Sequence, residues 1–144
     1  MGWYENRGIG DPEYAADRLE MAIVLYSLEH WEKARVLLQA MQEEEPDNLN
    51  TLGYLGMIAA KLGEQEHARL ISDRLAAIRR PYLFGRHTYF RACIHALLGE
   101  KSEAMKLIRE SLAQGIDYTQ FHADMKIQPL QDYDEFRDLI RPKG

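Results

Sequence analysis

The stretch "AKLGEQEHARLI" at residues 60–71 decides the fold, because two other stretches of the chain repeat its pattern. These are "YSLEHWEKARVLL" at residues 26–38 and "ALLGEKSEAMKLI" at residues 96–108. Each stretch runs from a leucine through a turn residue and a polar run to an alanine and an aliphatic pair. A pattern that recurs along one chain indicates internal repeats. The three stretches therefore predict one structural unit that is present three times.

The spacing of the units is nearly constant. Ala34 and Ala68 lie 34 positions apart, and Ala68 and Ala104 lie 36 positions apart. The two additional residues fall within "RRPYLFGRH" at residues 79–87. A period of this length is typical of units that consist of two helices and a turn.

Apolar residues recur at helical spacing on both sides of each turn. In unit one, Leu19, Ile23 and Tyr26 share one face before the turn, and Trp31 and Ala34 begin a similar face after it. The sequence thus predicts antiparallel helix pairs and no sheet. The seven expected helices span residues 13–29, 31–45, 48–62, 65–79, 86–98, 101–114 and 130–140, and a short helical turn is expected within 117–126.

Glycines and other small residues mark the turns and the close approaches between helices. Gly63 and Gly99 end the first helices of units two and three, where glycine adopts a positive φ at little cost. Glu29 stands at that place in unit one. Gly56 and Ala68 are predicted to lie where helices pack closely, so that larger side chains there would push the helices apart.

These units resemble the tetratricopeptide repeat family. The resemblance is carried by small, aliphatic and turn residues at matching positions of units one and two, whereas unit three departs from the pattern at Arg91 and His95. The matching residues are Met21, Ala22, Ala34 and Pro46 in unit one and Leu55, Gly56, Gly63 and Ala68 in unit two.

The resemblance implies an all-α fold, a short right-handed α-solenoid of three helix pairs with a C-terminal capping helix. The expected organisation is an N-terminal arm at residues 1–12 and one helical domain at 13–144. Within that domain the resemblance implies three repeats and a cap. The repeats are expected at about 15–48, 49–84 and 85–117, and the cap at 118–144.

A narrower resemblance concerns the C-terminal half, "RPYLFGRHTYFRACIHALLGEKSEAMKLIRESLAQG" followed by "FHADMKIQPLQDYDEFRDLIRPKG". It is similar to the tail of bacterial multidomain signalling proteins, in which such repeats follow a serine/threonine kinase, a DNA-binding domain or a TolB-like propeller. This implies a regulatory, partner-binding module. The amphipathic pattern of "PLQDYDEFRDLI" is that of a last helix which covers the apolar end of unit three.

Composition narrows the function classes. A chain of 144 residues that is 46% apolar suits one globular domain, and its net charge of −5 argues against a nucleic-acid binder. No apolar run of about eighteen residues is present, and the N-terminal "MGWYENRGIGD" lacks the features of a secretory signal. We therefore expect a soluble, cytoplasmic protein without membrane association.

Residues that carry chemistry are sparse. The single cysteine, Cys93, excludes an intrachain disulfide. A zinc site from Cys93, His95 and His122 is disfavoured, because residues 93 and 95 point to different faces of a helix. No nucleophile motif and no glycine-rich phosphate loop occurs. The expectation is a protein without catalytic activity, metal or cofactor.

Binding is then the expected function, and the resemblance places it on the first helices, which line the concave groove of a solenoid. An apolar groove suits an amphipathic helix or an extended hydrophobic peptide of a protein partner. The alternatives are a homodimer that pairs through the groove or an end face, and a groove filled by the N-terminal arm. The groove candidates are Leu19, Ile23, Tyr26, Asn50, Gly53, Met57, Lys61, Arg86, Tyr89 and Cys93.

The stretch "RRPYLFGRH" leaves two interpretations. In the first it is a joint between units two and three, in which Pro81 stops one helix and Gly85 makes the turn. In the second, its charged residues present a basic patch to a phosphate or an acidic peptide. Those residues are Arg79, Arg80, Arg86 and His87.

Overall fold

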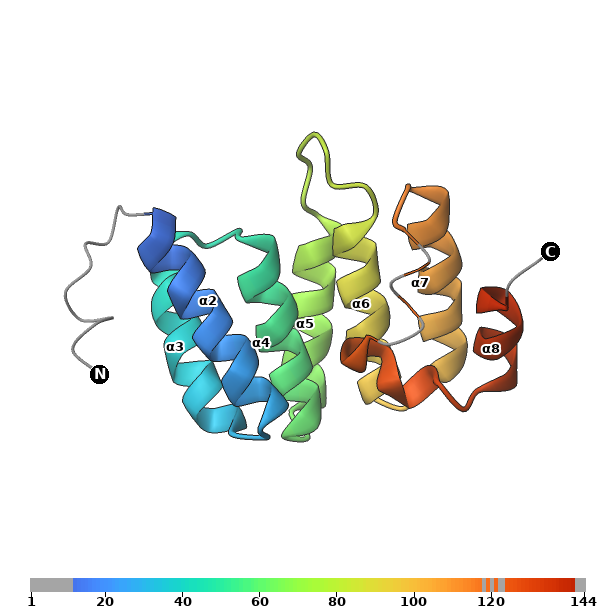
Figure 1. The fold of residues 1–144 in the computed structure, drawn as a ribbon, viewed down its shortest axis with the longest axis horizontal. Coiled ribbons are helices and arrows are strands. Elements are labelled where there is room, and N and C mark those ends of the chain that lie inside the picture. The colour runs from blue at the N-terminus through green and yellow to red at the C-terminus, as the bar shows by residue number, and fades with distance from the viewer. Residues whose placement is uncertain (1–11, 118, 120, 122–123, 142–144) are drawn as a thin grey trace.

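The structure is a computed structural model that describes residues 12–117, 119, 121 and 124–141. Every regular element in this part of the chain is helical (Figure 1). None of these helices is long and apolar enough to cross a membrane. The elements are α2 (Pro12–Ser27), α3 (Trp31–Glu44), α4 (Leu49–Lys61), α5 (Gln65–Ala76), α6 (Arg86–Leu97), α7 (Lys101–Ala113), the 3-10 helix η2 (Met125–Leu130) and α8 (Asp134–Ile140).

The six helices predicted for the repeats are confirmed, with ends that differ by at most three residues. The largest of these differences is at α5, which ends at Ala76, five positions before Pro81. Arg79 folds back there, and its Nη1 donates to the carbonyl of Ala76 at 2.6 Å. At the start of α4 the side chain of Asn48 caps the helix, because it accepts from the N–H of Thr51 at 3.1 Å.

The C-terminal helix differs more from the prediction. It begins at Asp134 rather than at residue 130, because Met125–Leu130 forms the separate 3-10 helix η2 and the chain is extended at Tyr133. Within 117–126, where a short helical turn was expected, Thr119 and Phe121 have 3-10 helical geometry, and η2 follows from Met125. Residues 1–11 of the expected N-terminal arm lie outside the described part of the chain.

Each helix from α2 to α7 packs against the next one in the chain, and together they form a row (Figure 1). In addition α4 contacts α6 directly and α2 contacts α4, whereas α3 and α5, and likewise α5 and α7, make no comparable contact. The first helices of the three pairs are therefore closer together than the second helices. This arrangement bends the row, with α2, α4 and α6 on its inner side.

The turns within the three helix pairs have the same geometry. The second residue after each first helix has a left-handed backbone, with φ of 64° at Glu29, 79° at Gly63 and 80° at Gly99. In each turn the following N–H donates to a carbonyl five residues earlier, as in a Schellman motif. These bonds run from His30 to Leu25 at 2.9 Å, from Glu64 to Ala59 at 2.8 Å and from Glu100 to His95 at 2.9 Å.

Replacement of Glu29 by glycine is expected to raise the free energy of unfolding by about 0.5–1 kcal/mol. A left-handed backbone costs a residue with a Cβ atom roughly 1–2 kcal/mol, which exceeds the roughly 0.4–1 kcal/mol that glycine adds to the entropy of the unfolded chain. Urea denaturation followed by circular dichroism measures the change. Gly99→Ala is the reciprocal control, because a Cβ atom there meets nothing within 4 Å, and it should destabilise. A Glu29→Gly chain less stable than the natural one would contradict this reading of the turn.

Equivalent ion pairs join neighbouring units. Arg35 on α3 contacts Glu64 in the turn of the second pair, with 2.7 Å between Nη1 and Oε1. Arg69 on α5 makes the same contact with Glu100 in the turn of the third pair. These pairs are separated by the repeat interval of 34 and 36 positions. Since exposed ion pairs contribute little to stability, their main effect is on the register between units.

Two glycines of α4 allow its close approach to α6. A Cβ atom on Gly53 would lie under 3.0 Å from the ring of Phe90, and one on Gly56 would lie under 3.0 Å from Ile94. Between these positions the ring of Tyr54 meets that of Phe90 edge-on, with 5.8 Å between ring centroids. The close packing predicted at Gly56 is thus present, and it involves α6 as well as Ile71 of α5.

Candidate functional site

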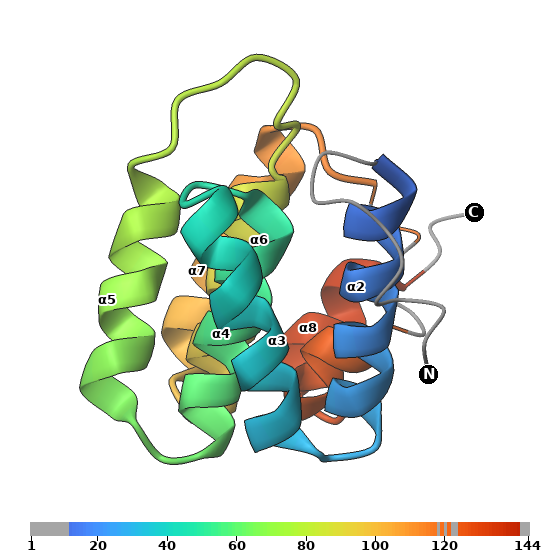
Figure 2. The same ribbon diagram turned by 90° about the vertical axis from the view of Figure 1, so that its left-hand side faces the viewer.

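The candidate site is the inner face of the row, where the chain's own C-terminal part packs against α6 and reaches the end of α2. We call Phe121 together with residues 124–130 the covering segment. Figure 2 shows this part of the chain on the same side as α2 and away from α5. Phe121, Ile127 and Leu130 of the covering segment are completely buried. With Asp124 they recur at every third position, which is the spacing of one face of a 3-10 helix.

Tyr89 of α6 is the main anchor of the covering segment. Its ring stacks on that of Phe121, with 5.2 Å between centroids and 22° between planes. Its hydroxyl donates to Oδ2 of Asp124 at 2.7 Å. The ammonium group of Lys126 lies 3.1 Å from the same oxygen and 5.9 Å from the centre of the Tyr89 ring. One aromatic side chain thus combines stacking, a hydrogen bond and a cation–π contact.

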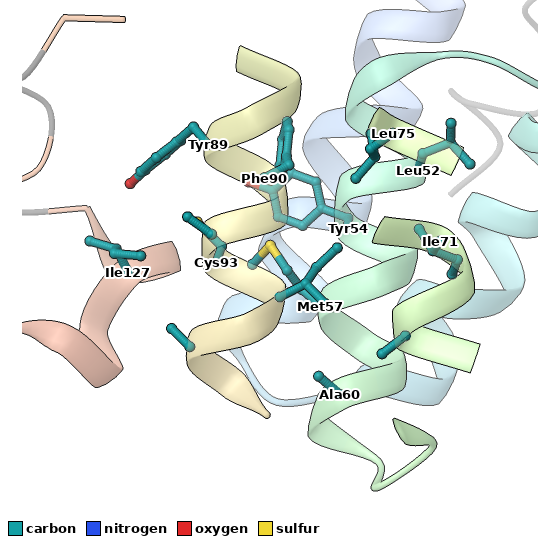
Figure 3. Packing of buried hydrophobic residues seen from close by; sticks show 14 of the residues in the cluster. Leu52, Tyr54, Met57, Ala60, Ile71, Leu75, Tyr89, Phe90, Cys93 and Ile127 are labelled. Carbon is teal, nitrogen blue, oxygen red and sulfur yellow. The ribbon is translucent and has the colours of Figure 1, made fainter. Parts of the chain in front are cut away.

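Deeper in the inner face the surface is apolar. Figure 3 shows Cys93 on α6 next to η2, which carries Ile127, and Met57 between α4 and α6. Met57, Cys93 and Ile127 are all completely buried. Nearer the end of α2, the hydroxyl of Ser27 lies 3.4 Å from the sulfur of Met125. The covering segment therefore lies along a strip from α6 to α2.

Burial keeps the phenol of Tyr89 and the thiol of Cys93 on this face neutral. It is the main cause that raises the pKa values of Tyr89 and Cys93 far above their usual ranges, and the negative charge of Asp124 adds to both effects. A neutral phenol and a neutral thiol are weak bases and weak nucleophiles. The inner face is therefore suited to burying apolar groups and to donating a hydrogen bond, and it is poorly suited to acid–base or nucleophilic chemistry.

The ten predicted groove residues have three different environments. Lys61 is exposed, with its ammonium group 5.5 Å above the ring of Trp31, and Arg86 donates to the backbone carbonyls of Leu83 and Tyr82. Neither contacts the covering segment among the contacts that the structure describes. Leu19, Ile23 and Asn50 are half-buried, and Tyr26, Gly53, Met57, Tyr89 and Cys93 are buried.

The structure thus brings Tyr89 and Cys93 together at the covering segment and does not bring Lys61 or Arg86 there. Gly53 faces Phe90 rather than a groove, because α4 and α6 pack too closely to leave space between them. In the described part of the chain the covering segment lies on the inner face. From the sequence, this segment was assigned to the cap at the end of unit three. Only α8 lies at that end, where Arg109 of α7 pairs with Glu135 at 2.5 Å.

Sequence reasoning missed Phe121, Asp124, Lys126 and Ile127 as residues of this site. Their signal was present in "FHADMKIQPL", where Phe121, Asp124, Ile127 and Leu130 follow one another at intervals of three. A period of three is shorter than that of an α-helix, and only the structure shows which surface these side chains meet.

A second cluster of polar residues joins α5 to α6. The hydroxyl of Ser72 lies 3.0 Å from Nε2 of His95, and Nδ1 of His95 lies 2.7 Å from Oε1 of Glu100. Hydrogen bonds with Arg69, as the largest cause, and with His95 hold the pKa of the Glu100 carboxyl below its usual value. The order of groups is that of a serine–histidine–carboxylate triad, so the cluster invites comparison with hydrolases.

The surroundings of Ser72 do not suit a nucleophile. Ser72 is 1% exposed in the interior of α5, and its hydroxyl accepts a hydrogen bond from Nε of Arg91 at 3.1 Å. The residues that line the described cavities do not include it. Arg91 and His95 are the two positions at which unit three departs from the tetratricopeptide pattern. The cluster satisfies both polar side chains between the helices, which is a structural function.

The zinc site considered at Cys93, His95 and His122 includes one residue, His122, outside the described part of the chain. Among the described residues no group of three or more histidine, cysteine, aspartate or glutamate side chains is arranged to hold a metal ion. Comparison of the chain with models of protein families, with curated proteins and with solved structures gave no match.

Proposed function

We propose that this chain is a non-catalytic scaffold for protein–protein interaction, built as a short solenoid of three tetratricopeptide-like helix pairs, whose inner face holds a short peptide segment. The observation that carries the proposal is the covering segment itself. It occupies the inner face through an aromatic, an acidic and two aliphatic side chains spaced by three residues. A partner segment with the same pattern would form the same contacts and would compete with it.

The contacts indicate how such a partner is recognised. Burial of an aromatic ring against Tyr89 and of an aliphatic side chain near Cys93 supplies most of the binding free energy, as buried anchors commonly do. The acceptor for the Tyr89 hydroxyl sets the register of the segment. The tethered covering segment has an effective concentration of roughly millimolar, so a free partner binds the natural chain only weakly unless the covering segment is loosened.

The non-catalytic part of the proposal is supported by the raised pKa values of Tyr89 and Cys93 and by the burial of Ser72. A regulatory role in a bacterial signalling protein of the cytoplasm, with a protein or peptide partner and neither nucleic acid nor membrane, is also part of the proposal. It rests on the resemblance of the C-terminal half and on the acidic net charge of −5.

Replacement of Asp124 by alanine in the full chain should increase its affinity for an added peptide with the sequence of residues 117–133 by about tenfold. The variant leaves the hydroxyl of Tyr89 without its acceptor, which costs about 1–3 kcal/mol and weakens the covering segment, whereas the peptide restores the aspartate. Fluorescence anisotropy of a labelled peptide measures the affinity. The rate at which a thiol reagent labels Cys93 reports the opening of the inner face, because this single cysteine is completely buried beside η2.

Asp132→Ala is the matched control, since Asp132 is an exposed residue of the same region and the change is identical. It should alter neither peptide affinity nor the labelling of Cys93. In the Asp124→Ala chain the peptide should also slow the labelling that the variant accelerates. If the peptide binds neither chain, or binds without protecting Cys93, the inner face is not a peptide site and the covering segment is only part of the core.

A specific observation favours homodimerisation as the second candidate. Val24 of α2 and Leu28, the first residue after that helix, lie about one helical turn apart, and they are 51% and 62% exposed. Ser27 between them contacts Met125, which is also exposed. A second copy would bury this apolar strip, and the mass in solution at tens of micromolar decides the matter. A monomer removes this candidate, and a dimer that Leu28→Glu dissociates supports it.

A further inference from the structure

A basic cavity lies away from the inner face, beneath the loop that joins α5 to α6. This loop stands out at the top of Figure 1. The cavity is open to solvent, has a volume of about 640 Å³ and is lined by the end of α5, the loop, the start of α6 and the end of α7. Small-molecule sites commonly measure about 300–1,000 Å³, so the cavity is large enough for one.

The walls of the basic cavity are positively charged in a chain whose net charge is −5. Arg79, Arg80 and Arg91 line it, against a single carboxylate, that of Glu110. Within the part of the chain that the structure describes, no carboxylate lies within 4.0 Å of any of these three guanidinium groups. Most other arginines of the described chain are paired with acids. Among the lining residues only the carboxylate of Glu110 offsets the positive charge of the three arginines.

Each of the three guanidinium groups is held in place while keeping donors to spare. Arg79 uses Nη1 for carbonyls at the end of α5, and Arg80 uses Nη2 for the carbonyl of Asp47 at 3.0 Å. Arg91 uses Nε for Ser72. A guanidinium has five N–H donors in a planar fork that matches the oxygens of a phosphate. Each guanidinium therefore has donors left for a ligand.

His87 lines the same cavity. Its Nδ1 is shielded from solvent and has no hydrogen-bond partner in the structure. Burial, and then the positive charges of Arg79 and Arg91, lower the pKa of His87. The imidazole therefore lies in the positive field of both arginines, and an anion bound between them would reverse that effect.

The loop adds an apolar wall that is held in a strained conformation. Tyr82 and Phe84 both have a left-handed backbone, with φ of 65° and 50°, which costs each about 1–3 kcal/mol. The side chain of Phe84 lines the cavity and yet is 59% exposed. A simple joint between helices requires neither the two strained residues nor the exposed ring. The combination suits a ligand with an anionic group and a planar apolar body.

We propose that the basic cavity binds a small phosphate monoester, with its phosphate held by Arg79 and Arg91 and its planar body placed against Phe84. The sequence left two interpretations of "RRPYLFGRH", a joint between units and a basic patch. The proposal combines them, because Arg79 and Arg80 line the cavity and also donate to backbone carbonyls of neighbouring elements. The site is separate from the inner face, so it stands whether or not a peptide binds there.

Titration of the full chain with phenyl phosphate, followed by calorimetry and by the imidazole resonances of His87, tests the proposal. We expect saturable binding with a shift of the His87 signals. Arg91→Gln and Arg79→Gln should each weaken binding at least about tenfold, because each removes charge-assisted hydrogen bonds. Phe84→Ala should weaken the binding of phenyl phosphate and leave that of inorganic phosphate unchanged.

Arg109→Gln is the matched control, because Arg109 is an arginine of α7 outside the cavity. It should bind phenyl phosphate as the natural chain does. Absence of saturable binding at millimolar phenyl phosphate overturns the proposal, as does an equal loss in Arg109→Gln. Circular dichroism of each variant shows whether a loss of binding comes from a loss of helical structure. If Arg91→Gln fails to fold, Arg79→Gln provides a second variant.

Discussion

A chain with alanine in place of Phe121 is expected to lose about 3–5 kcal/mol of its free energy of unfolding, the usual range for removing a buried phenylalanine. Phe121 is completely buried, stacks on Tyr89 and lies 6.1 Å from the ring of Phe136 on α8. It therefore holds both the covering segment and the last helix. Urea denaturation followed by circular dichroism measures the loss, and Cys93 should become accessible to thiol reagents under native conditions.

Phe84→Ala is the matched control for this prediction. Phe84 is exposed on the loop between α5 and α6, so the same change should alter stability by no more than about 0.5 kcal/mol. It should also leave Cys93 protected. Equal losses in the two variants would show that the burial of Phe121 does not stabilise the covering segment.

Replacement of Gly53 by alanine is the second change with a large expected effect. The added methyl group would lie under 3.0 Å from the ring of Phe90, so α4 and α6 must separate or the ring must move against Tyr54. Overpacking of this kind costs about 1–3 kcal/mol. Thermal unfolding should show a lower melting temperature, and Gly56→Leu should behave similarly because Ile94 lies equally close.

Gln39→Ala on the exposed side of α3 is the control, since it changes an exposed helical side chain without any close contact. Its melting temperature should remain near that of the natural chain. If Gly53→Ala and Gly56→Leu also melt unchanged, the close packing of α4 on α6 would be refuted, and with it the physical reason for small residues at these positions.

Local signals explain why the helices of the repeats could be predicted. Each helix carries its own apolar period, and each turn carries its own stop signal, even where Glu29 replaces glycine with φ of 64°. The helical spacing and the turn are properties of adjacent residues. They therefore needed no knowledge of which helices meet in space.

The candidate site depends on contacts between distant residues, and it was only partly predictable. Counting positions along the first helices selected Tyr89 and Cys93, which lie at the covering segment, and it also selected Gly53, which packs against Phe90. The position of the covering segment depends on the Tyr89–Asp124 bond, between residues 35 positions apart. No periodicity in the sequence reveals such a pairing.

The covering segment has a consequence for the calorimetry of the molecule. A peptide that enters an empty apolar groove removes surface from water and gives a negative change in heat capacity. Here the groove is already filled, so a competing peptide buries its own apolar groups while Phe121, Ile127 and Leu130 return to water. The two contributions oppose each other. Binding by exchange should therefore have a heat-capacity change near zero, which distinguishes it from binding to a groove that was open beforehand.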